Sequence, residues 1–407
     1  MHNSGGRRPH PRRWKHTLVS QASECIRYHI ASLLPHLRCR KVGALAHDID
    51  SNPTNVSMRE FTPATGSVPQ DWAALSHYLA RFGATLGPAS PRQFAGGLGN
   101  LNYLIEIDGE PAVLRRPPNG PLPPGANDMA REHRILSSLW RAYPLAPRAL
   151  FFCAEPSVLG APFQIIEYRR GIVIRDEWPV SLAGGPEIGA TLSRQLIESL
   201  AALHAVDPAQ IGLETLGRPA GFLGRTLDGW VRRGMAVADL ANGRAFDETV
   251  AWLREHVPPD VLPSLLHCDF KLDNMILEPS TLAPAAVIDW DMGTRGDPLW
   301  DLAVLLSYWA EPEDPACMHQ MRQMPTVQAG FWRRREVLEV YKRITSRTVD
   351  DFSFYRVLSV FRSAVVFLQL FDRYRRAPGP NARGAGFDTL GRELLDYAHN
   401  IANRRAD

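Results

Sequence analysis

Eight consecutive residues in the second half of the chain combine the side chains that phosphoryl transfer requires. They run from His267 to Asn274 with the sequence HCDFKLDN, in which Asp269 and Asn274 stand five positions apart. In phosphoryl transfer the protein mainly positions the reactants and neutralises the charge of the phosphates, and it does little covalent chemistry. The residue types and their spacing predict that Asp269 accepts or orients the proton of an attacking hydroxyl group. His267 is expected to brace the loop through hydrogen bonds.

A second acidic group follows fifteen residues after Asn274. The apolar segment Ala285–Ile288 ends there at Asp289, and Trp290 and Asp291 come next. Mg²⁺ prefers hard oxygen ligands and keeps several of its waters, so one or two protein ligands are enough. We therefore expect an amide oxygen of Asn274 and a carboxylate oxygen of Asp289 to hold Mg²⁺. Trp290 and Asp291 receive no definite role.

Two further acids and one histidine are expected to be structural. Asp301 stands at the start of the helix predicted at 300–309, where the free backbone amides and the helix dipole stabilise a carboxylate. Asp297 precedes this helix. His204 falls on the apolar pattern of another helix and is interpreted as a core histidine.

A glycine-rich turn lies upstream, at the mouth of a predicted hairpin. The turn is Phe94–Asn100, FAGGLGN, and the hairpin has strands at 103–107 and 112–116 joined by Asp108-Gly109. Glycines let a backbone come close to phosphate groups, so Gly96, Gly97, Gly99 and the backbone N–H of Asn100 are candidate ATP-phosphate contacts. The sequence contains no GxxxxGK[ST] motif.

The surrounding pattern predicts an α+β protein with two lobes. A small antiparallel β-rich lobe with one helix at 129–140 is expected at 58–170, and a larger, mainly helical lobe at 171–407. Helices are predicted at 71–82, 190–204, 222–235, 246–256, 300–309, 331–344, 354–374 and 387–402, and further strands at 149–154 and 163–168. Residues 1–57 carry a net charge of +6, which leaves −3 for the remainder. We interpret this basic arm as a disordered extension.

Composition excludes several classes of protein. No apolar run is long enough to span a bilayer, so no membrane association is expected. Five scattered cysteines without metal-type spacing indicate reduced thiols and a cytoplasmic location. A role in nucleic-acid binding or organelle import would rest on the basic arm alone and is disfavoured. The sequence does not indicate an oligomeric state.

Three segments together resemble the aminoglycoside phosphotransferase/choline kinase-like family, a relative of the protein kinases. They are HCDFKLDN, VIDWDMGTRGDPLWDLA and GGLGNLNYLI, and the resemblance covers about residues 70–400. The segments AVLRRPP, REHRIL, LAALHAVD and FDRYRR look most like the branch that is also found fused to acyl-CoA dehydrogenases. The resemblance implies a bilobal protein-kinase-like fold that binds ATP and Mg²⁺ between its lobes. It gives Asp269 the role of catalytic base and makes Asn274 and Asp289 the metal ligands.

The resemblance also implies nucleotide-binding residues in the small lobe. The strand position that usually holds lysine in kinases reads Val113-Leu114-Arg115, so Arg115 is the expected phosphate-binding cation and Arg116 the register-shifted alternative. Glu132 on the following helix is placed to pair with Arg115. Glu167 and Tyr168 mark the hinge where adenine would bind through backbone hydrogen bonds.

These features favour an ATP- and Mg²⁺-dependent kinase that phosphorylates a hydroxyl group of a small molecule. The acceptor site is expected on the helical lobe, at 222–235, 309–313 and 354–374. The local resemblance points to a hydroxyacyl-CoA-like acceptor, and arginines of that lobe would suit an anion: Arg232, Arg233, Arg373, Arg375 and Arg376. Two alternatives stay open. One is a nucleotide-binding pseudokinase with a regulatory or scaffolding role, favoured by Arg115, and the other is an aminoglycoside-type antibiotic phosphotransferase.

Overall fold

The computed structural model describes residues 61–95, 99–120, 127–177, 185–241, 243–376 and 384–403. The chain divides into two units, Met1–Val56 and Ser57–Asp407, and all described residues belong to the second. The predicted extension at 1–57 and two candidate site residues, Gly96 and Gly97, lie outside the described residues. The proposed boundary between two lobes at residue 170 stays a prediction.

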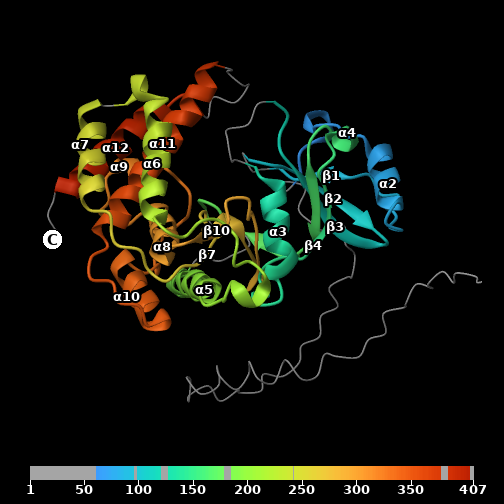
Figure 1. The fold of residues 1–407 in the computed structure, drawn as a ribbon, viewed down its shortest axis with the longest axis horizontal. Coiled ribbons are helices and arrows are strands. Elements are labelled where there is room, and N and C mark those ends of the chain that lie inside the picture. The colour runs from blue at the N-terminus through green and yellow to red at the C-terminus, as the bar shows by residue number, and fades with distance from the viewer. Residues whose placement is uncertain are drawn as a thin grey trace, which may run out of the picture. The chain divides into compact units, whose positions relative to one another are not determined.

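The first half of the second unit is built on a five-stranded antiparallel sheet in the order β1-β2-β3-β5-β4 (Figure 1). Helix α2 contributes Leu75 and Leu79 to a small core with the sheet residues Tyr103 and Phe163. The strands are β1 (Arg92–Gln93), β2 (Leu101–Ile107), β3 (Glu110–Arg116), β4 (Ala149–Cys153) and β5 (Phe163–Glu167), and the helices are α2 (Trp72–Ala80), α3 (Met129–Leu139) and α4 (Pro156–Leu159).

The predicted hairpin is present and is joined by a tight two-residue turn. Asp108 and Gly109 both have positive φ, 52° and 85°, and Ile107 pairs with Glu110 across the turn. This is the backbone that a two-residue hairpin prefers, and Asp-Gly is a favoured sequence for it. The turn fixes the register that places Arg115 opposite Asn102.

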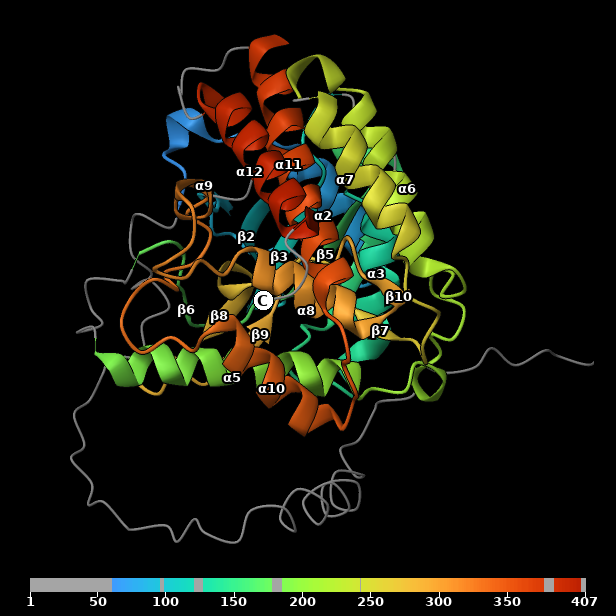
Figure 2. The same cartoon turned by 90° about the vertical axis from the view of Figure 1, so that its left-hand side faces the viewer.

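The second half is mainly helical. Its core is continuous across α5, α6, α7, α8, α11 and α12. In two perpendicular views α11 and α12 lie along each other, and Figure 2 shows α10 beside α5. The helices are α5 (Pro186–His204), α6 (Phe222–Met235), α7 (Gly243–Glu255), α8 (Pro298–Ser307), α9 (Ala316–Gln320), α10 (Arg334–Thr345), α11 (Ser353–Arg376) and α12 (Phe387–Asn403).

Helix α11 is the one described helix whose length and apolar composition would allow it to cross a membrane. Its most apolar window is 72% buried inside the protein, as expected of a core helix. Two buried side chains, Phe361 and Val365, belong to the large core. A single buried arginine, Arg362, interrupts the apolar pattern.

Two short sheets hold the segments that carry the predicted chemistry. Strand β7 (Ser264–Leu266) pairs with β10 (Thr294–Gly296), and β8 (Met275–Leu277) lies between β6 (Ile172–Val173) and β9 (Pro284–Val287). The loop 267–274 therefore begins at the end of β7 and closes into β8. The segment 288–293 bridges β9 and β10. Each loop therefore joins one short sheet to the other, and the strands that flank the loops pair as β7 with β10 and β8 with β9.

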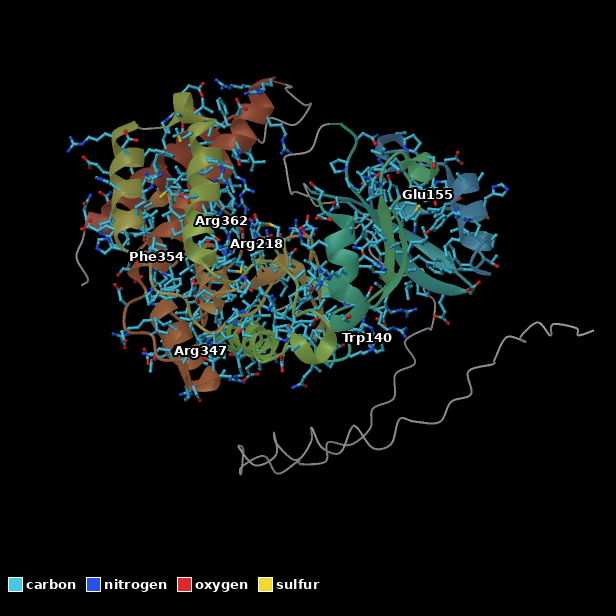
Figure 3. The ribbon with its side chains drawn as sticks, in the orientation of Figure 1. Trp140, Glu155, Arg218, Arg347, Phe354 and Arg362 are labelled. Carbon is cyan, nitrogen blue, oxygen red and sulfur yellow. The ribbon has the colours of Figure 1, made fainter. Side chains whose placement is uncertain are left out.

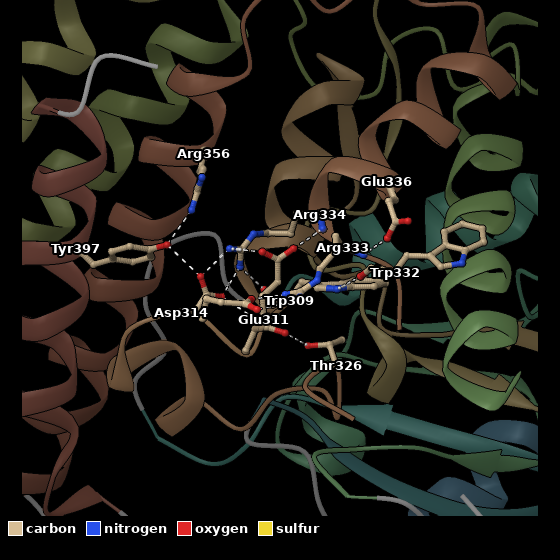
Figure 4. A network of polar contacts seen from close by, with 12 residues as sticks. Trp309, Glu311, Asp314, Thr326, Trp332, Arg333, Arg334, Glu336, Arg356 and Tyr397 are labelled. Atoms are coloured by element: carbon tan, nitrogen blue, oxygen red, sulfur yellow. Dashed lines mark hydrogen bonds and ion pairs between the residues drawn. The ribbon is translucent and has the colours of Figure 1, made fainter. Parts of the chain in front are cut away.

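A network of ion pairs fixes the connection between α8 and α10 (Figure 4). Arg334, at the start of α10, donates to Asp314 at 2.6 Å and pairs with Glu311 at 3.0 Å. The hydroxyl of Tyr397 donates to Asp314 at 3.3 Å and accepts a hydrogen bond from Arg356 at 2.8 Å. Because Arg356 and Tyr397 belong to α11 and α12, the network ties this connection to the helical core.

One glycine in the connection has no room for a side chain. Gly330 has φ of 89°, and a Cβ there would overlap the backbone of Pro186, the first residue of α5. We expect Gly330→Ala to lower the free energy of unfolding by about 3 kcal/mol or more, since left-handed strain and a backbone clash add. The matched control is Gly109→Ala, with φ of 85° and no atom within 4 Å of the new Cβ, which isolates the strain. Chemical denaturation of both variants measures the difference, and equal losses would contradict the clash.

Most elements lie within a few residues of their predicted positions, and α6 coincides with the predicted 222–235. The antiparallel sheet followed by helices confirms the α+β class. Neither β1, with two residues, nor α9, with five, was predicted. Such short elements carry too few residues to show a period, and tertiary contacts define them.

Candidate active site

One buried carboxylate, that of Asp301, holds the backbone of the loop 267–274. Asp301 accepts hydrogen bonds from the backbone N–H groups of His267 and Cys268, both at 2.6 Å. Its side chain is fully buried and also contacts Nε2 of His204 at 3.3 Å. His204 Nδ1 in turn lies 2.7 Å from the hydroxyl of Tyr341, so this core histidine orients the carboxylate. Asp301 thus fixes the loop backbone directly before Asp269.

The loop also makes an unusual backbone turn at Cys268. Its φ is 65°, in the left-handed region that non-glycine residues rarely adopt. Asp301 stabilises this conformation because it binds the N–H of Cys268 itself. Cys268 itself lines a cavity, so Asp269 directly follows a cavity-lining residue.

Asp269 is surrounded by donors. The Tyr308 hydroxyl donates to Oδ1 at 2.6 Å, and Arg362 Nη2 lies 3.3 Å from the same oxygen. Lys271 Nζ lies 3.3 Å from Oδ2, and Asn274 Nδ2 donates to the Asp269 backbone carbonyl at 2.9 Å. Burial would raise the pKa of Asp269, but Lys271, Arg362 and the Tyr308 hydrogen bond outweigh it and hold the pKa well below its usual range. Asp269 is therefore a carboxylate across the neutral pH range.

His267 connects the two loops. Its Nδ1 accepts a hydrogen bond from the N–H of Asp269 at 3.2 Å, which leaves Nε2 to donate to the carbonyl of Ile288 at 2.9 Å. The ring also lies against Trp290, with centroids 4.7 Å apart. These contacts are the bracing that the sequence predicts, and they give Trp290 a packing role.

The candidate metal ligands come from adjacent backbones. The N–H of Ile288 donates to the carbonyl of Asn274 at 2.9 Å, so Asn274 and Asp289 start from paired positions. Asp289 has φ of 71°, which turns the chain out of β9. Within the described residues, Asn274 Oδ1 and Asp289 Oδ2 accept no hydrogen bond. One amide and one carboxylate oxygen with free lone pairs fit Mg²⁺.

Arg115 connects the large sheet to the Asp289 loop. Its guanidinium pairs with Glu132 at 3.2 Å and with Asp289 Oδ1 at 2.6 Å, and it donates to Asn102 at 3.2 Å. Glu132 is fully buried on α3 and accepts the N–H of Trp290 at 3.2 Å. The predicted Arg115–Glu132 pair is thus present, and it includes Asp289, which the sequence did not indicate.

Arg116, the register-shifted alternative, faces elsewhere. Its guanidinium donates to Gln70 and Asn119, both at 2.7 Å, and to the carbonyl of Pro117 at 3.1 Å. These partners lie in the loops around the sheet, so Arg116 serves local structure.

The remaining nucleotide-binding candidates surround the sheet. Asn127, just before α3, donates to the carbonyl of Gly99 at 2.7 Å and to the side chain of Asn100 at 2.9 Å. Glu167 ends β5 and pairs with Arg169 at 3.1 Å, and Tyr168 follows it. The described end of the glycine turn is therefore anchored to the helix that carries Glu132.

Asp297 has the structural role predicted for it. It caps α8 by accepting the N–H of Leu299 at 2.9 Å, and it accepts the hydroxyl of Tyr355 at 2.7 Å. Asp301 lies one turn further along the same helix. It accepts hydrogen bonds from the backbone amides of the loop 267–274 and does not cap the helix.

A cavity of about 430 Å³ adjoins Asp269. One face of α6 forms a wall, and the loops at 268 and 292–294 form the opposite side. Arg362, which contacts Asp269, also lines it (Figure 3). Among the described residues, four arginines and no Asp or Glu line the cavity: Arg131, Arg225, Arg233 and Arg362.

Sequence reasoning missed Lys271, Tyr308 and Arg362 around Asp269. Two signals were available. Lys271 stands inside the motif, and Arg362 is a charged residue within the otherwise apolar stretch 357–368 of a predicted helix. Of the arginines expected at the acceptor site, Arg233 lines the cavity, whereas Arg375 and Arg376 pair with Asp372 on α11 at 2.7 and 2.9 Å.

Comparisons with known proteins agree with this geometry. Acyl-CoA dehydrogenase family member 11 of Gallus gallus is 31% identical over 75% of this chain and 40% of its own. This chain spans about a third to two fifths of the length of the curated relatives it matches. A solved Ralstonia eutropha protein, provisionally named an aminoglycoside phosphotransferase, has a TM-score of 0.69 at 24% identity and covers 83% of this chain and all of its own.

A second solved structure is a thermostable mutant of aminoglycoside phosphotransferase APH(4)-Ia in a ternary complex with AMP-PNP and hygromycin B. It has a TM-score of 0.52 at 15% identity, over 82% of this chain and 99% of its own. These likenesses confirm the kinase-like aminoglycoside phosphotransferase fold. Residues 90–338 match the model of the phosphotransferase enzyme family. The chain therefore belongs to the phosphotransferase enzyme family.

Proposed function

We propose that this protein is an ATP- and Mg²⁺-dependent kinase that transfers the γ-phosphate of ATP to a hydroxyl group of a small molecule. The observation that carries the proposal is the surroundings of Asp269. An ionised carboxylate lies beside an Asn–Asp oxygen pair and between two cations, one of which, Arg362, also lines the cavity. The fold neighbour that holds AMP-PNP and hygromycin B together supports a nucleotide and a small molecule as the two reactants.

Asp269 would orient the acceptor hydroxyl for in-line attack. Its low pKa makes it a reliable hydrogen-bond acceptor and a weak base. A weak base suffices because the transition state of phosphoryl transfer is loose and the hydroxyl proton is lost late. Tyr308 and Arg362 hold Oδ1, and Lys271 and Asn274 hold Oδ2, so the carboxylate keeps one orientation.

Asn274 and Asp289 would hold Mg²⁺ through Oδ1 and Oδ2 respectively. Bound Mg²⁺ neutralises charge on the β- and γ-phosphates. Arg115 keeps the second oxygen of Asp289 occupied and so directs Oδ2 toward the metal. Arg115 contacts Asp289 from the sheet, so the phosphate chain would enter on that side.

The acceptor class follows from the charge of the cavity. Aminoglycosides are polycations and need an acidic site, whereas the lining residues that the structure describes include four arginines and no Asp or Glu. The curated relatives are named as acyl-CoA dehydrogenase family members, which makes a hydroxyacyl-CoA the first acceptor to test. We therefore favour a hydroxyacyl-CoA-like acceptor over an antibiotic.

The test is ADP release from Mg-ATP with a panel of acceptors. Hydroxyacyl-CoAs, choline, sugars and aminoglycosides are compared, with Asp269→Asn as the inactive reference. We expect turnover with a hydroxyacyl-CoA. ATP binding without turnover on any acceptor would instead indicate a pseudokinase.

Tyr308→Phe tests how Asp269 is held. Removing the 2.6 Å hydrogen bond raises the pKa of Asp269, because that bond favours the carboxylate. Turnover needs the carboxylate, so the acidic limb of the pH–rate profile should move to higher pH, and turnover should fall about tenfold. The matched control is Tyr355→Phe, which removes a 2.7 Å hydrogen bond to Asp297 and should leave the acidic limb in place. Identical profiles for the two variants would contradict the role of Tyr308.

A further inference from the structure

One face of α6 is shaped as a binding surface. The residues Phe222, Arg225, Thr226, Gly229, Trp230 and Arg233 all line the cavity. Their spacing of three and four residues places them in one stripe along the helix. A smaller hollow of about 210 Å³ shares three of these residues and adds Arg218 (labelled in Figure 3). Arg218 thus adds a second arginine beside Arg225 at the N-terminal end of α6.

The arginines of the cavity differ in what already neutralises them. Arg362 pairs with Asp269 at 3.3 Å, and Arg131 pairs with Asp128 at 3.1 Å. Arg225 donates to the backbone carbonyls of Ala220 and Arg218, which fix its position and leave its charge uncompensated.

Of these arginines, Arg233 has the fewest polar partners for its guanidinium group. Its guanidinium lies over the ring of Trp230, 4.6 Å from the centroid, and within the described residues it has no carboxylate partner. Partial burial and the charges of Arg362 and Arg232 lower the pKa of Arg233 from its usual value. Clustered cations that lack protein anions create a positive potential able to bind an anion from solution.

We propose that the α6 stripe binds an anionic group of the acceptor, a phosphate or carboxylate, with Arg233 as its main contact and Arg225 as its second. The proposal rests on the proposed kinase function and names the part of the acceptor that this site recognises. Arginine suits the task because its planar fork binds phosphate and carboxylate with two hydrogen bonds. Phe222 and Trp230 supply the apolar surface next to it.

The cavity extends from this anion site to Arg362, the residue that contacts Asp269. Arg362 lines the cavity and contacts Asp269, while Arg233 lies on α6 in the same lining. An acceptor could therefore place its hydroxyl at Asp269 and its anionic group on α6. The enzyme would then select acceptors by a negative charge that lies away from the reacting hydroxyl. Such a contact strengthens acceptor binding and leaves the chemistry of transfer unchanged.

Three matched probes test the site without phosphotransfer. Hexyl phosphate, hexanoate and hexanol carry the same chain with different head groups, and their binding is measured by calorimetry with and without AMP-PNP and Mg²⁺. The parent is compared with Arg233→Gln and with Arg232→Gln, which removes the same charge from a neighbouring residue outside the lining. We expect hexyl phosphate to bind the parent and Arg232→Gln alike, and Arg233→Gln about tenfold more weakly. Hexanol should bind weakest to the parent, and hexanoate binding tighter than hexyl phosphate would identify a carboxylate as the group.

Equal binding of hexyl phosphate to the parent and Arg233→Gln would overturn the proposal, and so would an absence of binding to the parent. Weaker AMP-PNP binding in Arg233→Gln, with hexyl phosphate unchanged, would assign the arginine to the nucleotide and also overturn it. Failure of the kinase proposal looks different, because these probes can bind while no acceptor is phosphorylated. Conversely, turnover of an anionic acceptor such as a hydroxyacyl-CoA that is unaffected by Arg233→Gln would leave the kinase and remove the anion site.

Discussion

Asp269→Asn should lower turnover by about 10³-fold while leaving nucleotide binding intact, because a positioned general base contributes of this order. The amide keeps the size of the side chain and can still accept the Tyr308 hydrogen bond. It cannot accept a proton, and its NH₂ group would face either Arg362 and Tyr308 or Lys271 and Asn274, all of them donors. Single-turnover transfer from Mg-ATP, with AMP-PNP binding measured alongside, separates chemistry from binding.

The matched control for this variant is Asp273→Asn. Asp273 belongs to the same loop and lies 3.5 Å from Lys271, but it does not contact Asp269. We expect Asp273→Asn to keep turnover within a few-fold of the parent. A comparable loss in both variants would mean that the loop needs its negative charge as a whole and that Asp269 has no distinct role.

Asp301→Asn should both destabilise the protein and slow turnover. The carboxylate accepts two backbone N–H groups at 2.6 Å, and an amide can replace only one of its oxygens. The other N–H would face an NH₂ group inside the core, so we expect a loss of about 3 kcal/mol in the free energy of unfolding. Chemical denaturation measures the loss, and turnover per folded molecule should fall because the backbone before Asp269 is released.

Asp297→Asn distinguishes these two effects. Asp297 is also a buried acid of the α8 N-terminus with two donors, the Leu299 N–H and the Tyr355 hydroxyl. It does not contact the catalytic loop, so its replacement should cost stability and leave turnover per folded molecule unchanged. A fall in turnover equal to that of Asp301→Asn would show that α8 acts through general stability.

The sequence predicted what depends on local pattern. Asp-Gly specifies the hairpin turn, periodic apolar residues specify α6, and the motif spacing places Asp269 and Asn274 on one loop. Pairing of Arg115 with Glu132 could also be foreseen, because a charged residue in a buried strand needs a partner.

Long-range contacts account for most of what the sequence did not show. Tyr308 and Arg362 reach Asp269 across 39 and 93 residues, and no spacing rule connects them. The acceptor arginines illustrate the same limit. Nothing in the sequence distinguishes Arg233 from Arg375. In the structure, however, Arg375 pairs with Asp239 and Asp372, whereas Arg233 lines the cavity. Whether an arginine is structural or available depends on its neighbours in space.

The Arg115 guanidinium has a mechanical consequence. It joins Asn102 on β2, Glu132 on α3 and Asp289 after β9, using its three nitrogen atoms. A lysine ammonium has one nitrogen and cannot occupy all three directions. Any motion of the five-stranded sheet relative to the loops at 267–274 and 288–293 must stretch the Arg115–Asp289 contact, so opening of the proposed site would release the carboxylate that we propose to hold Mg²⁺. The rate of nucleotide exchange and the affinity for the metal would therefore change together, because both depend on the same Arg115–Asp289 contact.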